Sequence, residues 1–214
     1  MIKKISIVVF TFLTAISCIA CGKEEQVVKE VDTVEVGEAI NQSAENIAPD
    51  IDINGCDTFT QIVDKKLEDG MGWTNTDFGD TNVLMVCSGT YDNLDGNTAG
   101  IDATFFIYKD AVPKELGKVC SGGTAYPLAK NDVYLYTASN HWICKYIVTE
   151  DGVKIMENAM VEYDSDGKET YYYVSQESGT SSEISQTEAE ELFYGLYEEM
   201  ENAEVICFDT KVGE

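Results

Sequence analysis

Two stretches of the chain carry apolar residues at the spacing of one helical face, which predicts two amphipathic helices. The first follows a candidate N-cap at Asp57-Thr58 and is expected to end at Gly70. The second follows Ser185, which forms an S-x-x-E capping box with Glu188. The apolar positions are Phe59, Ile62, Val63 and Leu67 in the first helix and Ala189, Leu192, Phe193, Leu196 and Met200 in the second.

Short runs rich in Val, Ile, Tyr and Thr lie between the two predicted helices, and turn residues separate them. Two-residue turns such as Asp151-Gly152 join strands in hairpins, so the recurring runs and turns indicate antiparallel strands. The predicted strands are 83–88, 101–108, 116–120, 133–136, 142–149, 153–163, 169–175 and 204–208. Residues 72–80 are expected to form a loop.

These elements predict a single α+β domain over residues 51–214. Its expected core is one antiparallel β-meander of about seven to eight strands, with the two amphipathic helices packed on one face of it. A sheet that curls into a partial barrel or a propeller-like fragment would fit the same pattern. The sequence shows no internal repeat that would favour a propeller.

The N-terminus has the pattern of a secretory signal peptide. Lys3 and Lys4 precede a nearly continuous apolar run over residues 5–16. That run is shorter than the ~20 residues needed to span a bilayer. A positive start, a short apolar core and small residues after it predict that residues 1–20 are a signal peptide rather than a folded element.

The end of this segment, Cys18-Ile19-Ala20-Cys21-Gly22, resembles a bacterial lipobox. The resemblance implies cleavage before Cys21, a lipid on Cys21 and a domain that faces outside the cytoplasm while anchored to the cell membrane. The family usually has Leu or another aliphatic residue where this chain has Cys18, so cleavage before Cys18 is an alternative. An ordinary signal peptide with two incidental cysteines is another.

The chain is strongly acidic, and the acidity begins directly after Cys21. Residues 22–50 hold eight Asp or Glu against two Lys, and no aromatic residue. Such a composition buries too little apolar surface to offset the entropy of ordering, so residues 21–50 are predicted to be a disordered tether. The formal net charge of the chain is −25. This charge opposes binding to nucleic acid, because phosphate contacts need clustered Lys and Arg.

The cysteines indicate neither a metal site nor a disulfide framework. Those after residue 50 are Cys56, Cys87, Cys120, Cys144 and Cys207. Their number is odd, they contain no C-x-x-C pair, and the chain has one histidine, so no structural zinc is expected. Three of them fall on alternate predicted strands, ~10 Å apart, whereas a disulfide needs Cα atoms within ~7 Å. We expect mostly buried free thiols and no cofactor.

Two acidic loops match the calcium-binding EF-hand pattern only in part. The first contains Asn93, Asp95 and Gly96 but has Tyr91 in place of the first ligand, and the second, at 164–167, lacks the closing acid. Because Asp and Gly form turns regardless of metal, both are interpreted as hairpin loops.

One stretch has the composition of a catalytic or anion-binding loop: Cys120, Ser121, Gly122, Gly123 and Thr124. A phosphate loop is followed by a helix, whereas Tyr126-Pro127 follows here, so a strand-ending turn is the simpler interpretation. An enzyme would need Cys120 to contact His141 as a thiolate–imidazole pair with a third orienting group. No local signature supports that pair.

Aromatic residues cluster on consecutive predicted strands. Alternate residues of a strand share a face, so Tyr134 and Tyr136 share one, and Tyr171 and Tyr173 share one. Exposed aromatic rings of this kind would suit a sugar or a peptide, whereas packing under the helices is the alternative. The candidate ligand-binding residues are Tyr134, Tyr136, Trp142 and Tyr173, together with Ser121, Gly122, Gly123 and Thr124.

The stretch LGKVCSGGTAYPL, residues 116–128, and the hairpin–helix–strand ending resemble surface lipoprotein domains of Gram-positive bacteria. That resemblance implies no particular activity. The leading hypothesis is a membrane-anchored extracytoplasmic binding module, not an enzyme, whose partner is a protein, peptide or glycan. The alternatives are a cell-envelope enzyme that uses Cys120 and His141, and a structural envelope protein.

Overall fold

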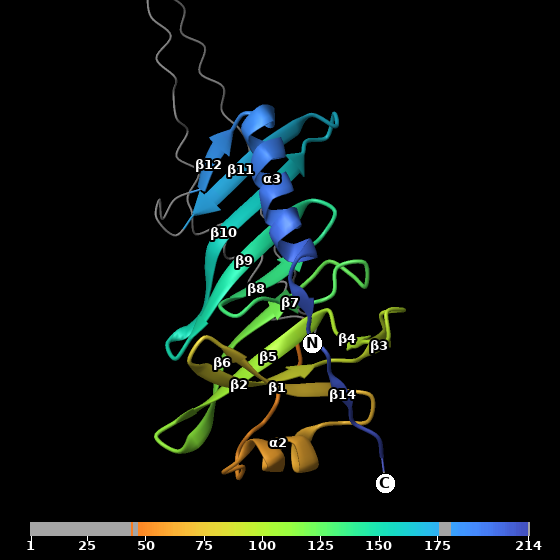
Figure 1. The fold of residues 1–214 in the computed structure, drawn as a ribbon, viewed down its shortest axis with the longest axis vertical. Coiled ribbons are helices and arrows are strands. Elements are labelled where there is room, and N and C mark those ends of the chain that lie inside the picture. The colour runs from red at the N-terminus through yellow and green to blue at the C-terminus, as the bar shows by residue number, and fades with distance from the viewer. Residues whose placement is uncertain (1–43, 45–46, 176–180, 214) are drawn as a thin grey trace, which may run out of the picture.

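The computed structural model describes residues 44, 47–175 and 181–213. Every strand pair in this part of the chain is antiparallel. The strands form two stacked sheets, each with one helix on its outer face (Figure 1). The α+β class, the antiparallel pairing and the two helices agree with the prediction. The predicted signal peptide, Cys18, Cys21 and most of the predicted tether lie outside the described residues.

The first sheet has five strands in the order β14 (Asp209–Thr210), β1 (Gly72–Phe78), β2 (Thr81–Cys87), β5 (Asp102–Lys109) and β6 (Val112–Cys120). The second has seven, in the order β12 (Ser181–Ile184), β11 (Glu169–Ser175), β10 (Gly152–Tyr163), β9 (Trp142–Thr149), β8 (Tyr134–Ala138), β7 (Ala129–Lys130) and β13 (Glu204–Val205). A short ribbon of β3 (Tyr91–Asp92) and β4 (Thr98–Ala99) stands apart from both.

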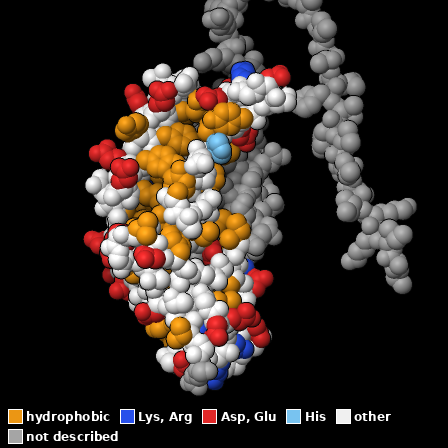
Figure 2. Space-filling model, turned by 90° about the vertical axis from the view of Figure 1, so that its right-hand side faces the viewer, with side chains coloured by type: hydrophobic (Ala, Val, Ile, Leu, Met, Phe, Trp, Pro, Cys, Tyr) orange, Lys and Arg blue, Asp and Glu red, His pale blue; other side chains and the backbone are white. Residues whose placement is uncertain are grey.

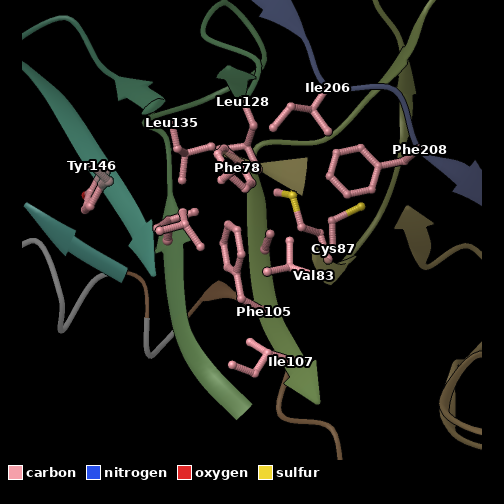
Figure 3. Packing of buried hydrophobic residues seen from close by; sticks show 14 of the residues in the cluster. Phe78, Val83, Cys87, Phe105, Ile107, Leu128, Leu135, Tyr146, Ile206 and Phe208 are labelled. Carbon is pink, nitrogen blue, oxygen red and sulfur yellow. The ribbon is translucent and has the colours of Figure 1, made fainter. Parts of the chain in front are cut away.

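The largest apolar core lies between the inner faces of the two sheets (Figure 3). Met85 and Phe105 of the five-stranded sheet face Leu135 and Tyr146 of the seven-stranded sheet in this cluster. The prediction of one continuous sheet is therefore wrong. The residues of β2 from Val83 to Cys87 are buried without alternation, because that strand is covered on both faces and the sheet forms an inner layer.

Helix α2 (Phe59–Lys66) covers the outer face of the five-stranded sheet. The Thr58 side chain accepts a hydrogen bond from the Gln61 backbone N–H, which confirms the predicted N-cap. The helix ends at Lys66, one turn before Gly70. Its buried residues pack against the outward side chains of β2 and β5, which are Leu84, Val86 and Phe106.

Helix α3 (Gln186–Glu201) covers the outer face of the seven-stranded sheet. Ser185 and Glu188 form the predicted capping box. Leu196 packs against Ile143 and Ala159 on the sheet. The two helices thus lie on opposite outer faces of the sandwich, and the expectation that both cover one face is wrong. Helical periodicity fixes which side of a helix is apolar, whereas the partner of that side depends on long-range contacts.

Two further segments differ from the prediction. Residues 72–80 contain strand β1 and a tight turn at Gly79, which has φ +56°. The strand was missed because its interior is polar. The chain also packs before Ile51: Ala48 is buried, and Pro49 accepts a hydrogen bond of 2.6 Å from the Thr104 hydroxyl.

Among the described residues, no helix is long and apolar enough to cross a membrane. The cysteines in this part of the chain are all free thiols; four are buried, and Cys207 is exposed. The expectation of mostly buried free thiols is confirmed.

Candidate functional site

A cavity of about 580 Å³, widely open to solvent, lies between strand β8 and helix α3. Its lining combines aromatic rings, amides and carboxylates. The lining residues are Asn131, Tyr134, Tyr136, Gly195, Glu198, Glu199 and Asn202.

The alternation of β8 delivers the two tyrosines to this cavity. Leu135 points into the core between the sheets, so Tyr134 and Tyr136 project from the opposite face, under α3. Tyr136 is fully buried and lies opposite Lys145 in the register of β8 and β9. The Tyr136 hydroxyl donates a hydrogen bond of 2.9 Å to Glu199 Oε2 on the helix.

The charged side chain of Lys145 lies next to Tyr134 and Tyr136. Its Nζ lies 2.6 Å from Glu199 Oε2 and 3.2 Å from Glu157 Oε2. The same Nζ lies 4.5 Å from the centre of the Tyr134 ring, within cation–π range. Burial alone would lower the pKa of Lys145, but its hydrogen bonds and charge pairing with Glu199 and Glu157 raise it. The ammonium is therefore already paired with two carboxylates.

Tyr173 belongs to the same polar network and lies on β11, the strand next to that of Glu157. Its hydroxyl donates a hydrogen bond of 2.5 Å to Glu157 Oε1. Burial first, and then the bond to Glu157, raise the pKa of Tyr173, while burial and Glu199 do the same for Tyr136. Both phenols consequently stay protonated and act as hydrogen-bond donors.

The amides on the rim of the cavity are held in place. Asn131 Oδ1 accepts from the backbone N–H groups of Val133 and Tyr134, and its Nδ2 donates to the Tyr136 hydroxyl at 3.0 Å. Asn202 donates to the Glu198 carbonyl at 2.8 Å as the C-cap of α3. Fixed side chains of this kind lose little entropy when a ligand binds.

Gly195 opens the cavity on its helical side. An added Cβ at this position would meet no atom within 4 Å. A glycine inside a helix costs about 1 kcal/mol relative to alanine. Packing within the described chain does not require this glycine, which lines the wall of the cavity.

The structure divides the predicted ligand-binding residues. Tyr134 and Tyr136 line the cavity and Tyr173 is linked to it through Glu157. Trp142 lies on the opposite face of β9, where it packs against the core between the sheets. The grouping of Trp142 with the tyrosines is therefore wrong, because Trp142 and Lys145 differ by an odd number of positions along one strand.

The loop Ser121, Gly122, Gly123 and Thr124 does not line the cavity either. It packs against the other end of β8, where the Gly122 N–H donates to the Ala138 carbonyl at 2.8 Å and the Ser121 hydroxyl accepts from the Ala138 N–H at 3.3 Å. A Cβ on Gly122 would lie 2.4 Å from Cβ of Ser139. This close approach supplies a structural reason for that glycine.

The two members of the alternative catalytic pair have different environments. Cys120 is buried, and burial, followed by the charge of Asp102, raises the pKa of its thiol to about 11. A protonated buried thiol is a poor nucleophile. His141 is exposed, and its ring packs edge to face with the Tyr163 ring, with the two ring centres 5.4 Å apart.

The acidic loops use their carboxylates to hold turns. Asp95 accepts from the Asn97 N–H and the Asn93 amide, and Asp164 accepts from the N–H groups of Asp166 and Lys168. Within the described ranges, no group of three or more His, Cys, Asp or Glu side chains is placed to hold a metal ion.

Sequence reasoning missed Lys145, Glu157, Glu199, Asn131 and Gly195. The first three come from three different elements, and only the fold brings them together. Gly195 is visible in the sequence as an isolated glycine inside a strongly periodic helix, where it costs about 1 kcal/mol relative to alanine.

No protein-family model matches the chain, and comparison with curated proteins and with solved structures finds no match.

Proposed function

We propose that this protein is a lipid-anchored extracytoplasmic binding module whose cavity between β8 and α3 holds a glycan fragment. One observation carries the proposal: a cavity of about 580 Å³ with fixed polar walls opens where a helix contains a glycine that its own packing does not need. Ligand sites typically measure about 300–1,000 Å³ and combine apolar surface with a few oriented polar groups.

The charges of the cavity favour a ligand that is neutral or cationic. Lys145 lies against the Tyr134 ring, and Glu199 and Glu157 already neutralise it. The carboxylates of Glu198 and Glu199 accept hydrogen bonds, as sugar hydroxyl groups require. The ring of Tyr134 adds an apolar surface against which a sugar ring packs. An anionic ligand would find no unneutralised cation among the lining residues.

The proposal also covers where the protein is located in the cell. Cleavage before Cys21 and a lipid on that residue would anchor the chain to the membrane, and the acidic segment that ends before Ala48 would separate the folded part from the surface. Glycans, proteins and peptides of the cell envelope would then be within reach of the cavity. The proposal includes neither a nucleic acid partner nor a cofactor.

The test is a thermal-unfolding series with defined probes: neutral N-acetylglucosamine oligosaccharides, cationic glucosamine oligosaccharides, short neutral peptides, phosphate and CaCl₂. A ligand at a hundred times its Kd that binds only the folded state adds ~2.7 kcal/mol of stability. We expect a saturable rise of the unfolding midpoint with one class of oligosaccharide. No rise with either oligosaccharide would refute the glycan proposal.

Two variants test whether the ligand that raises the unfolding midpoint binds in this cavity. Gly195→Leu fills the opening of the cavity and should abolish the rise. Thr187→Leu adds the same side chain to an exposed position nearer the start of α3 and should leave it intact. A rise that survives Gly195→Leu would place the ligand elsewhere.

A further inference from the structure

A second, more apolar groove lies beside the C-terminal half of α3. It measures about 240 Å³ and is formed by residues 125–127, by Tyr197 and Met200 of the helix, and by Ala203 and Val205 that follow it. Glu201 of the same helix also lines the groove. None of these residues lines the cavity that holds Tyr134 and Tyr136.

The groove presents the apolar surfaces of its tyrosines, because their hydroxyls are engaged elsewhere. The Tyr126 hydroxyl donates to Asn140 Oδ1 at 2.8 Å, and the Tyr197 hydroxyl donates to the Ser139 carbonyl at 2.6 Å. The two rings lie 6.4 Å apart, centre to centre. The ring of half-buried Phe193 stacks on that of Tyr197, with the ring centres 6.3 Å apart.

The molecule also exposes apolar side chains outside this groove. Figure 2 shows hydrophobic side chains gathered over the upper half of the molecule near the single histidine. Tyr163 and Tyr194 are large apolar residues that are 52% and 81% exposed.

The rim of the groove is acidic. Glu201 lines it, and Glu204 is exposed in the strand that follows. The charged residues of α3 are all glutamates, at positions 188, 190, 191, 198, 199 and 201. The lining contains no Lys or Arg. Charge complementarity therefore selects a cationic partner.

The volume of the groove limits how much of the partner can enter it. About 240 Å³ is below the typical range for a small-molecule site, which is about 300–1,000 Å³. It suits a single large side chain, as in interfaces where one buried anchor carries much of the binding energy.

We propose that this groove docks a basic peptide segment of another protein. One aliphatic or aromatic side chain of the segment enters between Tyr126, Tyr197 and Met200, and its Lys or Arg residues contact Glu201 and Glu204. This proposal stands apart from the glycan cavity on the other side of the helix.

The test uses the full chain and three synthetic peptides of equal length: alternating Lys and Leu, Lys and Ser, and Glu and Leu. Methyl NMR of labelled methionine reports on Met200, and buried Met85 serves as an internal control. We expect only the Lys–Leu peptide to shift the Met200 resonance in a saturable way. No saturable shift, or an equal shift by the Lys–Ser peptide, would overturn the proposal.

Matched charge reversals show where the charged contact lies. Glu201→Lys at the rim should weaken binding of the Lys–Leu peptide roughly fivefold at low salt. Glu191→Lys makes the same change on the same helix, at a residue that lines neither cavity, and should change binding less than about twofold. Equal weakening by both would mean that the peptide responds only to the overall charge. If Glu201→Lys fails to fold, the methionine spectra of the unmodified chain still decide the matter.

Discussion

Lys145 Nζ lies 2.6 Å from Glu199 Oε2, and this ion pair joins the middle of the seven-stranded sheet to helix α3. The lysine side chain is 12% exposed and that of Glu199 is 43% exposed. The pair therefore lies between the surface case, which contributes little, and the buried case, where loss of one partner costs several kcal/mol.

Replacement of Lys145 by Met should lower the free energy of unfolding by about 1–3 kcal/mol. The change leaves Glu157 and Glu199 close to one another without their shared cation. Urea denaturation of the two proteins measures it. Lys66→Met is the control, because Lys66 pairs at 3.7 Å with Asp52, whose side chain is 69% exposed. A loss no larger than that of the control would contradict a stabilising role for the Lys145 network.

Replacement of Gly195 by Ala should raise the free energy of unfolding by up to about 1 kcal/mol. The new methyl group meets open space, and the helix gains propensity. Gly72→Ala provides the contrast, because its Cβ would lie 2.4 Å from Thr90 Cγ2 and 2.5 Å from Cys87 Sγ. That variant should be clearly destabilised in the same urea measurement. Destabilisation by Gly195→Ala would show that the glycine serves the fold and not a ligand.

Replacement of Ser185 by Ala should cost about 1 kcal/mol of stability. The substitution removes the oxygen that accepts a hydrogen bond from the Glu188 N–H at 3.3 Å. Hydrogen bonds from Ser185 also lower the pKa of Glu188. A group whose pKa is lowered on folding stabilises the folded state above its ordinary pKa, and this stabilisation is lost as the pH falls. The difference in stability between variant and parent should therefore shrink in acid. Ser165→Ala, in an exposed turn, should have little effect at any pH.

Stability should decline in alkali. Burial, and then the charge of Tyr126, raise the pKa of Tyr197 to about 12. The unfolded chain releases the phenolic proton near pH 10 while the folded chain retains it, so the unfolded state is favoured as pH rises from about 10 to 12. Each such tyrosine contributes a slope of up to about 1.4 kcal/mol per pH unit. Urea denaturation from pH 8 to 11.5 measures the decline, and Tyr197→Phe should reduce its slope. An unchanged slope would contradict the prediction.

The exposed thiol of Cys207 should react with a disulfide reagent much faster than the buried thiols. Burial raises the pKa of Cys87 and Cys144 to about 12, which leaves almost no thiolate at neutral pH. In a chain with Cys18 and Cys21 replaced by Ser, Cys207→Ser should remove the fast phase at pH 8. The slow thiols should appear only when urea unfolds the protein. A fast phase that persists in the variant would show that a second thiol is accessible.

Local sequence signals predicted the elements of this protein. The Thr58 and Ser185 caps formed as expected because a cap depends on residues within one helical turn of it. Strands β8 to β11 followed from alternation and from hairpin turns such as Asp151-Gly152, which act over a few residues. The net charge and the apolar start of the chain likewise needed no structure to be recognised, and the lipid on Cys21 remains a prediction from that segment.

The tertiary structure alone decided how these elements divide into layers. Val83 to Cys87 is buried on both faces, but a short apolar run has the same sequence whether one sheet or two cover it. The cavity depends on the same long-range choice: Tyr136, Lys145 and Glu199 lie on β8, β9 and α3, and their contacts exist only after α3 packs on the outer face of the second sheet. Periodicity is a property of neighbours in sequence, whereas a binding site is formed by neighbours in space.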